Sequence, residues 1–179
     1  MHCPRNAGFA AASLGRKVDD RRIRETDAVT GEILTDGVVT LRPSKPDDAP
    51  LIIAARDAAF RRFIGKGSAV PAPEYVIVVD GRVVGWVDHD RDDDRWWLMP
   101  EEVNVGYHVF PEHRGQGHAT RAVHLMLEHL RTDTDCEIAT LLIHPDNGAS
   151  LTVADRNGFE RADDVEERTF WKRRVREAD

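Results

Sequence analysis

The 179-residue chain lacks the features that define several protein classes. Its two cysteines, Cys3 and Cys136, are too few for a disulfide scaffold or a cysteine-based metal site and favour a reducing compartment. No apolar run approaches the ~18 residues that a membrane helix needs. The net charge is −7, whereas proteins that coat nucleic acid present a basic face. We therefore expect a cytoplasmic protein that binds neither membrane nor nucleic acid.

The N-terminal residues differ in character from the rest. Residues 1–36 are rich in charge and show no apolar period, which favours a disordered or loosely packed extension. A wrongly assigned start codon would also explain them. Ile33 and Leu34 could still pair as a short strand beside the domain. We expect residues 37–179 to form one α/β domain, which is an ordinary domain size.

The most informative run spans residues 114–119, Arg-Gly-Gln-Gly-His-Ala. Before it, residues 103–110 alternate apolar and polar side chains as in a β-strand, and after it residues 119–130 have the spacing of an amphipathic helix. A glycine-rich turn in this position leaves free N–H groups at the positive end of the helix dipole, which binds phosphate. Glycine lets the ligand's oxygens approach the backbone. We therefore expect a ligand that carries phosphate.

Two common phosphate-binding motifs do not fit this run. A P-loop continues with Lys and Ser or Thr after its last glycine, but His118 and Ala119 follow Gly117 here. A dinucleotide fingerprint needs a further glycine where Thr120 stands, and it needs a surrounding βαβ unit. Both alternatives fail at residues that carry their mechanism.

Arg114, Gly117 and Ala119 fill the fixed positions of the pattern Gln/Arg-x-x-Gly-x-Gly/Ala. The run resembles the pyrophosphate loop of the GNAT N-acetyltransferase superfamily. Residues 138–159 resemble a later motif of that superfamily, a β-prone run followed by Asn-x-x-Ser, a short helix and Gly-Phe. With the elements in the family's order, the resemblance spans roughly residues 38–175. Residues 85–88, 106–109 and 119–122 look most like the RimJ/RimL branch, which acetylates protein N-termini and has relatives that modify small amines.

The resemblance implies a fold and a cosubstrate. The fold is an α/β domain of the α+β kind, with a central mixed, mostly antiparallel sheet of six to seven strands, flanked by helices and splayed at the acetyl-CoA site. The cosubstrate is acetyl-CoA. Its pyrophosphate would contact the amides of Arg114, Gly115, Gln116, Gly117, His118 and Ala119. The backbone of His108, Val109 and Phe110 would hold the pantetheine arm and thioester, and Asn147 and Ser150 would lie beside the arm.

The catalytic groups are less clear than the cofactor loop. Many relatives carry a glutamate base two residues before the strand glycine, where this chain has Asn104. Glu102 lies one step further along the same face, so it is the best substitute, with Glu101 and His108 behind it. A solvated strand-end carboxylate is an equally good interpretation of Glu102. The usual tyrosine acid is replaced by Ala154, which leaves Ser150 or an ordered water to stabilise the departing thiolate.

The reaction implied is direct acetyl transfer, because neither cysteine lies near a base that could make it a nucleophile. The acceptor would be a protein N-terminus or a small primary amine. The alternative is a non-catalytic acyl-CoA sensor or assembly module with a degenerate site. The protein could form a homodimer. No metal is expected, because no histidine or glutamate at ligand spacing joins the aspartates of residues 90–95, which favours a solvated hairpin tip.

Two further features concern the surroundings of the site. Asp80-Gly81 between two β-prone runs predicts a hairpin. Residues 46–64 have helical spacing, and the glycines and prolines of residues 65–73 exclude a second full helix before the next strand. Most members of the superfamily have two helices there, and the second helps to cover the acceptor site. We therefore expect a more open acceptor site in this chain.

Overall fold

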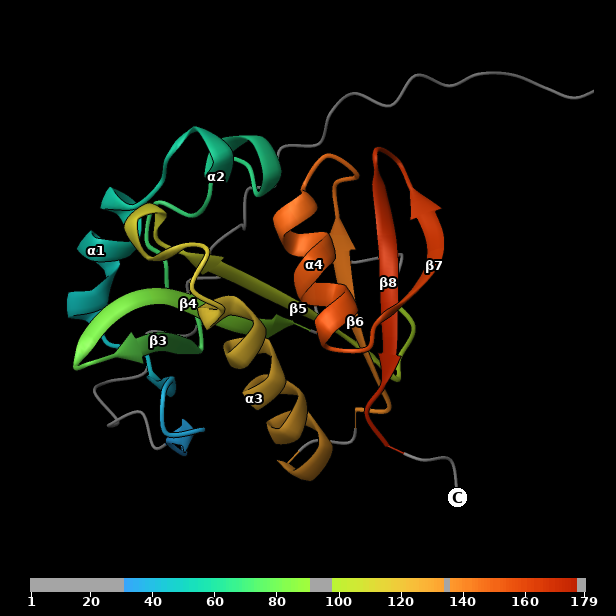
Figure 1. Cartoon of the computed structure of the whole chain (residues 1–179), viewed down its shortest axis with the longest axis horizontal. Helices are drawn as coiled ribbons and strands as arrows, with labels where there is room; N and C mark the ends of the chain where they lie inside the picture. The colour runs from blue at the N-terminus through green and yellow to red at the C-terminus, as the bar shows by residue number, and fades with distance from the viewer. Residues whose placement is uncertain (1–30, 91–97, 134–135, 177–179) are drawn as a thin grey trace, which may run out of the picture.

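A single twisted sheet forms the centre of the computed structural model, which describes residues 31–90, 98–133 and 136–176 (Figure 1). Eight strands lie in the order β1-β2-β3-β4-β5-β6-β8-β7, and only the β5–β6 neighbours run parallel. The predicted mixed, mostly antiparallel sheet is confirmed, but it has eight strands rather than six or seven. The strands are β1 (Leu34–Thr35), β2 (Thr40–Pro43), β3 (Tyr75–Val79), β4 (Arg82–Asp90), β5 (Glu102–Val109), β6 (Ile138–Ile143), β7 (Glu160–Val165) and β8 (Arg168–Arg174).

The N-terminal edge strand β1 accounts for part of the difference between the eight observed strands and the six or seven predicted. Leu34 pairs with Leu41 and Thr35 with Thr40, so the short strand considered at Ile33 and Leu34 forms one position further along. The remainder of the predicted extension, residues 1–30, lies outside the described residues.

Helices cover both faces of the sheet. They are η1 (Pro46–Asp48), α1 (Ala49–Ala54), α2 (Ala58–Phe63), η2 (Pro111–His113), α3 (His118–Asp133) and α4 (Gly148–Arg156). Buried residues of α3, such as Met126, share the main core with odd-numbered positions of β5 such as Val103 and Val105. On the opposite face, Ile52 of α1 packs with Val76 of β3. Because strand side chains alternate, the even-numbered positions of β5 face the side of α1 and α2.

The hairpin predicted at Asp80-Gly81 is confirmed. Asp80 and Gly81 have φ angles of 48° and 74° and join β3 directly to β4. Two consecutive positive φ angles match the right-handed twist of the strands, and aspartate followed by glycine tolerates them best. The hairpin therefore aligns β4 beside β5 from a local sequence signal.

The single helix predicted over residues 46–64 is wrong. α1 ends at Ala54, and Asp57 has an extended backbone and accepts a hydrogen bond from the Phe60 amide at 2.8 Å. Aspartate in that geometry caps a helix N-terminus, so a second short helix begins at Ala58. Helical periodicity alone did not reveal the break, because the apolar spacing continues across it.

The one parallel strand pair is short. β5 and β6 are in register only at Glu102–Ile138, Val103–Ala139 and Asn104–Thr140, although both strands continue beyond these residues. Residues 105–109 therefore separate from residues 141–143, while β6 remains fully paired with β8 on its other side. The predicted splay of the strands is confirmed. We call the space between these two segments the interstrand cleft.

Candidate active site

The loop before α3 presents its backbone to solvent. Gly115 and Gly117 have φ angles of 76° and 81°, which glycine adopts without strain, and α3 begins at His118. Among the described residues, the amides of the six residues 115–120 have no hydrogen-bond acceptor; the next amide, that of Arg121, donates to the Gly117 carbonyl at 3.2 Å. Six N–H groups thus gather at the positive end of a sixteen-residue helix.

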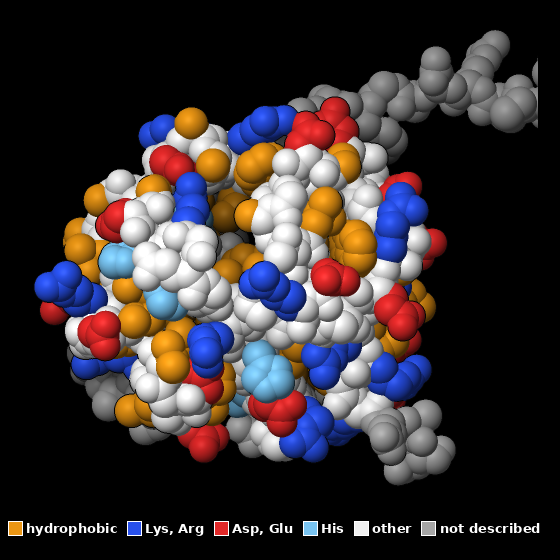
Figure 2. All heavy atoms as spheres, in the orientation of Figure 1, with side chains coloured by type: hydrophobic (Ala, Val, Ile, Leu, Met, Phe, Trp, Pro, Cys, Tyr) orange, Lys and Arg blue, Asp and Glu red, His pale blue; other side chains and the backbone are white. Residues whose placement is uncertain are grey.

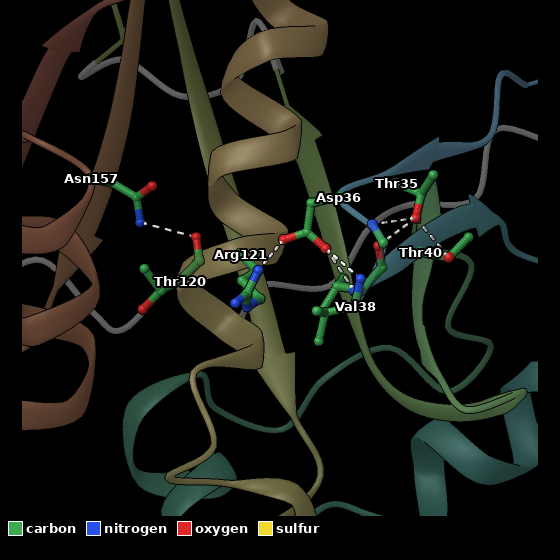
Figure 3. Close-up of polar contacts among 9 residues, drawn as sticks. Thr35, Asp36, Val38, Thr40, Thr120, Arg121 and Asn157 are labelled. Carbon is green, nitrogen blue, oxygen red and sulfur yellow. Dashed lines mark hydrogen bonds and ion pairs between the residues drawn. The ribbon is translucent and has the colours of Figure 1, made fainter.

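The first turn of α3 is anchored from two sides (Figure 3). The Asn157 side chain, at the end of α4, donates to the Thr120 carbonyl at 3.3 Å. From the other side, Asp36 in the β1–β2 turn forms an ion pair with Arg121 at 2.6 Å. These contacts hold the start of α3 against α4 and the sheet edge, so the direction of its free amides is set by tertiary structure.

The Arg114 side chain is bound to α2 and β5. Its guanidinium donates to both carboxylate oxygens of Asp57, at 2.7 and 3.1 Å, and its Nε donates to the Val109 carbonyl at 3.0 Å. The Arg114 hydrogen bond is the main reason that the pKa of Asp57 falls to about 2, against the opposing effect of burial. The positive charge of Arg114 is therefore already paired with a carboxylate, and what the loop leaves free is its backbone.

His108 lies on the α1 face and is only 5% exposed. Its Nε2 is 3.0 Å from Arg114 Nη2, and its ring packs edge-on against Phe60. Because arginine can only donate, Nε2 accepts and the ring proton resides on Nδ1. Burial, helped by the Arg114 charge, lowers the pKa of His108 to about 4. The His108 side chain is therefore a neutral ring that supports Arg114. This geometry does not favour His108 as a base that accepts protons in catalysis.

The main-chain groups of β5 alternate between β4 and the interstrand cleft. The Phe110 amide donates to the Val84 carbonyl of β4 at 2.8 Å. Because the direction of the backbone groups alternates along a strand, those of His108 also face β4, whereas those of Tyr107 and Val109 face the cleft. Of the three residues expected to hold the pantetheine arm, Val109 directs its amide towards the cleft, and its carbonyl accepts from Arg114 Nε. Tyr107 joins Val109 there.

Glu102 is buried at the closed end of the interstrand cleft, where β5 still pairs with β6. Its side chain is 2% exposed; Oε1 accepts from Lys172 Nζ at 2.6 Å and Oε2 from the Met99 amide at 3.2 Å. The interpretation as a solvated strand-end carboxylate is therefore wrong. Since both oxygens already have donors, the geometry does not favour Glu102 as a free base either.

Asn147 and Ser150 lie at the N-terminus of α4, across the interstrand cleft from β5. The Asn147 side chain caps this helix by accepting from the Ser150 amide at 3.2 Å. Burial raises the pKa of Tyr107 on β5 to about 12, and the nearby Ser150 side chain opposes this rise. Among the described residues, the buried Tyr107 hydroxyl has no hydrogen-bond partner. The structure thus places Ser150 near a buried, unpaired hydroxyl that the sequence did not single out.

A match to a family model establishes the protein family of this chain. Residues 39–160 match the model described as the acetyltransferase (GNAT) domain, which covers about two thirds of the chain. The chain belongs to the GNAT acetyltransferase family. It is an N-acetyltransferase by family. Among curated proteins, no sequence gives a significant match.

Solved structures show that the whole domain has this family's architecture. A GNAT-family acetyltransferase from Bacillus anthracis is 13% identical with a TM-score of 0.68, covering 80% of this chain and 99% of the other. RimL, a ribosomal L7/L12 α-N-protein acetyltransferase solved with coenzyme A, is 16% identical with a TM-score of 0.67, covering 80% and 98%. The aminoglycoside acetyltransferase AAC(6')-Ib with coenzyme A is 17% identical with a TM-score of 0.67, covering 76% and 94%. At these identities the likeness establishes the fold.

In this GNAT domain, α2 reaches the loop that follows β6. Arg62 forms an ion pair with Asp146 at 2.5 Å, and the rings of Phe63 and His144 lie 5.7 Å apart. Figure 2 shows a hollow, with hydrophobic side chains inside it, between the loop before α3 and α4. The expectation of a more open acceptor site rested on the absence of a second helix. Because α2 is present and contacts the far side of the interstrand cleft, that expectation is not supported.

The GNAT sheet also positions a carboxylate that the sequence argument missed. Asp88 of β4 lies opposite Gly106 of β5, on the face of α1 and α2. Burial raises its pKa to about 6, against the hydrogen bond from the Glu74 amide. The signal available in the sequence was the alternation of β4, which places Asp88 on the same face as its cross-strand neighbours.

Among residues 31–90, 98–133 and 136–176, no three His, Cys, Asp or Glu side chains gather as metal ligands. Most of the acidic run at residues 90–95 lies outside the described residues. In the same described part of the chain, no helix has the length and apolar character to cross a membrane.

Proposed function

We propose that the protein transfers an acetyl group from acetyl-CoA directly to a primary amine. The observation that carries this proposal is the set of six free amides at residues 115–120, at the mouth of the interstrand cleft. Backbone N–H groups at a helix N-terminus suit a diphosphate, and an unpaired strand edge suits an extended, amide-containing arm such as pantetheine.

The cofactor's position follows from these two features. The pyrophosphate would accept hydrogen bonds from the amides of residues 115–119, and the pantetheine arm would extend along β5 as an additional strand. The Val109 amide and the main-chain groups of Tyr107 face the interstrand cleft, so they would bind the arm and the thioester, while the Val109 carbonyl stays with Arg114. Ser150 and Asn147 would border the arm from α4. The free cleft edge of β5 would then be paired by the cofactor.

The chemistry at the thioester needs a polarised carbonyl and a stabilised leaving group. A main-chain amide of β5 that faces the cleft can donate to the carbonyl oxygen as it gains negative charge. Tyr107 remains protonated at neutral pH because its pKa is about 12, so it can donate a hydrogen bond to the departing thiolate with Ser150 beside it. We propose this hydroxyl pair in place of the tyrosine that Ala154 replaces.

The acceptor belongs to the class of primary amines. RimL is described as an α-N-protein acetyltransferase and AAC(6')-Ib as an aminoglycoside acetyltransferase, and both are solved with coenzyme A. We propose a protein N-terminus or a small-molecule primary amine as acceptor, and the RimJ/RimL-like motifs favour the former.

The loop assignment is tested by replacing Gly117 with valine. A Cβ atom at residue 117 would have no other protein atom within 4 Å, but the valine side chain would obstruct the approach of a diphosphate to the amides. Gly81→Val is the matched control, because Gly81 also has a positive φ and open surroundings but lies at the β3–β4 turn. We expect coenzyme A affinity, measured by calorimetry, to fall at least ~100-fold in Gly117→Val and to be retained in Gly81→Val.

Two other outcomes would count against the loop assignment or against the enzymatic function. Equal affinity in Gly117→Val and the native protein would refute the loop as the pyrophosphate site. Tight coenzyme A binding without thiol release in the presence of any primary amine would favour the acyl-CoA sensor over the enzyme.

A further inference from the structure

Asp88 and Gly106 lie opposite each other beside the interstrand cleft, and the nearest atom to a Cβ placed on Gly106 would be Trp86 Cζ3 at 3.8 Å. They are register partners in the antiparallel β4–β5 pair, so their Cα atoms lie about 5.5 Å apart. Gly106 is also the first position on the α1 face of β5 beyond Asn104, the last residue in register with β6. At the point where the two parallel strands separate, β5 therefore has no side chain between Asp88 and the cleft.

The Asp88 carboxyl group is held at one oxygen and open at the other. Oδ1 accepts hydrogen bonds from the amides of Glu74 and His89, both at 3.1 Å. Among the described residues, no donor contacts Oδ2. The side chain is half-buried, and Oδ2 is not sealed from solvent. A carboxylate with one anchored and one free oxygen has a defined orientation and can still accept a proton.

The charged groups around Asp88 keep its proton affinity near the neutral range. Its pKa is raised to about 6, chiefly by burial and also by the carboxylates of Glu74 and Asp90. The Glu74 amide and the charge of His89 act in the opposite direction. From β5, the neighbours on this face are Gly106 and Asn104, and neither titrates. Carboxyl groups with such raised pKa values gather at catalytic sites.

We propose that Asp88 is the general base of acetyl transfer, accepting the proton that the acceptor nitrogen loses above Gly106. This inference rests on the proposed acetyltransferase function and adds the residue that the glutamate-to-Asn104 change leaves missing. It also defines the acceptor's route: the amine enters on the α1 face, whereas the cofactor loop and α4 belong to the α3 side.

The neutral amine nitrogen attacks the thioester carbonyl carbon, and the new C–N bond makes the N–H proton acidic. Asp88 takes that proton, the C–S bond breaks, and the electron pair leaves on sulfur. Tyr107 and Ser150 hydrogen-bond the thiolate, which is then protonated from water, while Asp88 returns its proton to solvent. The products are an N-acetyl amide and coenzyme A, with no external oxidant or reductant.

The other candidates for the base are less suited. Glu102 has both oxygens bound to donors, and Lys172 compensates its charge. His108 has its acceptor nitrogen turned to Arg114 and holds its proton on a buried Nδ1. Asp88 differs from both because one oxygen remains available.

The test is Asp88→Asn, which keeps an Oδ1 acceptor for both amides but cannot take a proton. Asp80→Asn at the tip of the same hairpin is the control, because it makes the same change of charge away from the cleft. Glu102→Gln tests the rival base. Each protein is titrated with coenzyme A by calorimetry, and thiol release from acetyl-CoA is followed from pH 5 to 9 with the amine that the native protein acetylates fastest.

We expect kcat to fall ~100-fold or more in Asp88→Asn at pH 7, with coenzyme A affinity and acceptor KM changed less than about threefold. The native profile should rise through a pKa near 6, and this rise should disappear in Asp88→Asn alone. A native-like profile in Asp88→Asn, or loss of the rise in Glu102→Gln instead, would overturn the role of Asp88 while leaving the acetyltransferase intact. Absence of native turnover with every amine would overturn both proposals, and loss of coenzyme A binding in the native protein would refute the loop.

Discussion

Arg114 and Asp57 form a bidentate ion pair, with oxygen–nitrogen distances of 2.7 and 3.1 Å. Arg114 belongs to the loop that leads into α3, and Asp57 is the N-terminal cap of α2. The pair therefore fastens the helix that reaches across the interstrand cleft to the loop that carries the free amides. A residue of the family's loop pattern here stabilises the tertiary arrangement around the proposed phosphate site.

The two functions of Asp57 can be separated by substitution. Asp57→Asn retains a good helix cap but removes the ion pair, and we expect a loss of about 0.2–1 kcal/mol in the free energy of unfolding. Asp57→Ala removes both and should cost a further ~1 kcal/mol. Urea unfolding measures both losses. Equal stabilities of the two variants would show that the cap to Phe60 contributes nothing.

The Tyr107–Ser150 pair predicts a coupled effect on turnover. Tyr107→Phe and Ser150→Ala should each lower kcat about 10–100-fold, because the thiolate loses a donor. The double variant should be little worse than the poorer single variant if the two hydroxyls act as a unit. Thiol-release kinetics provide the measurement. Tyr75→Phe, which changes the chain's other tyrosine, is the control. Fully multiplicative losses would show that the hydroxyls act independently.

Gly85 is required by the close approach of β4 and β5. A Cβ atom at this position would lie 2.3 Å from the His108 carbonyl oxygen, which is backbone and cannot turn aside. Gly85→Ala should therefore lower stability by about 1–3 kcal/mol and the melting temperature by several degrees. Gly148→Ala is the control, since nothing lies within 4 Å of its added Cβ. Melting temperatures are measured by calorimetry. Equal values for Gly85→Ala and Gly148→Ala would contradict a close approach of the two strands at Gly85.

Asp88 is expected to reduce stability where it is ionised. Its pKa is raised from 3.8 to about 6, so the folded protein binds this proton more tightly than the unfolded chain. The native state is therefore favoured at low pH and loses that contribution as pH rises from about 4 to about 6. At pH 8 the cost is at most about 3 kcal/mol, and Asp88→Asn should recover part of it.

Urea unfolding at pH 8 and at pH 4 would test whether the ionised Asp88 carboxylate lowers the free energy of unfolding. The advantage of Asp88→Asn should be present at pH 8 and absent at pH 4. A variant less stable than the native protein at pH 8 would mean that the Asp88 charge stabilises the fold, and the raised pKa would be wrong.

Some elements could be predicted because their signals are local. The Asp80-Gly81 hairpin, the glycine turn at residues 115–117 and the start of α3 each depend on backbone angles that a few neighbouring residues determine. The break before α2 was missed because Asp57 acts through one side-chain hydrogen bond, which does not disturb the helical spacing of apolar residues. Glu102 was placed on the correct face, but its partner Lys172 lies 70 residues away in sequence.

The amino-acid sequence alone predicted the strand-loop-helix that presents free amides, since glycine positions and hydrophobic alternation encode short-range geometry. The resemblance of its motifs implied the family and the splay of the sheet. Only the tertiary structure decided which polar groups are available for chemistry. It paired Arg114 with Asp57 and Glu102 with Lys172, and it brought Tyr107 to Ser150 and Asp88 to Gly106. Proton affinity depends on burial and on charges contributed by distant segments, and these are established only when the strands come together.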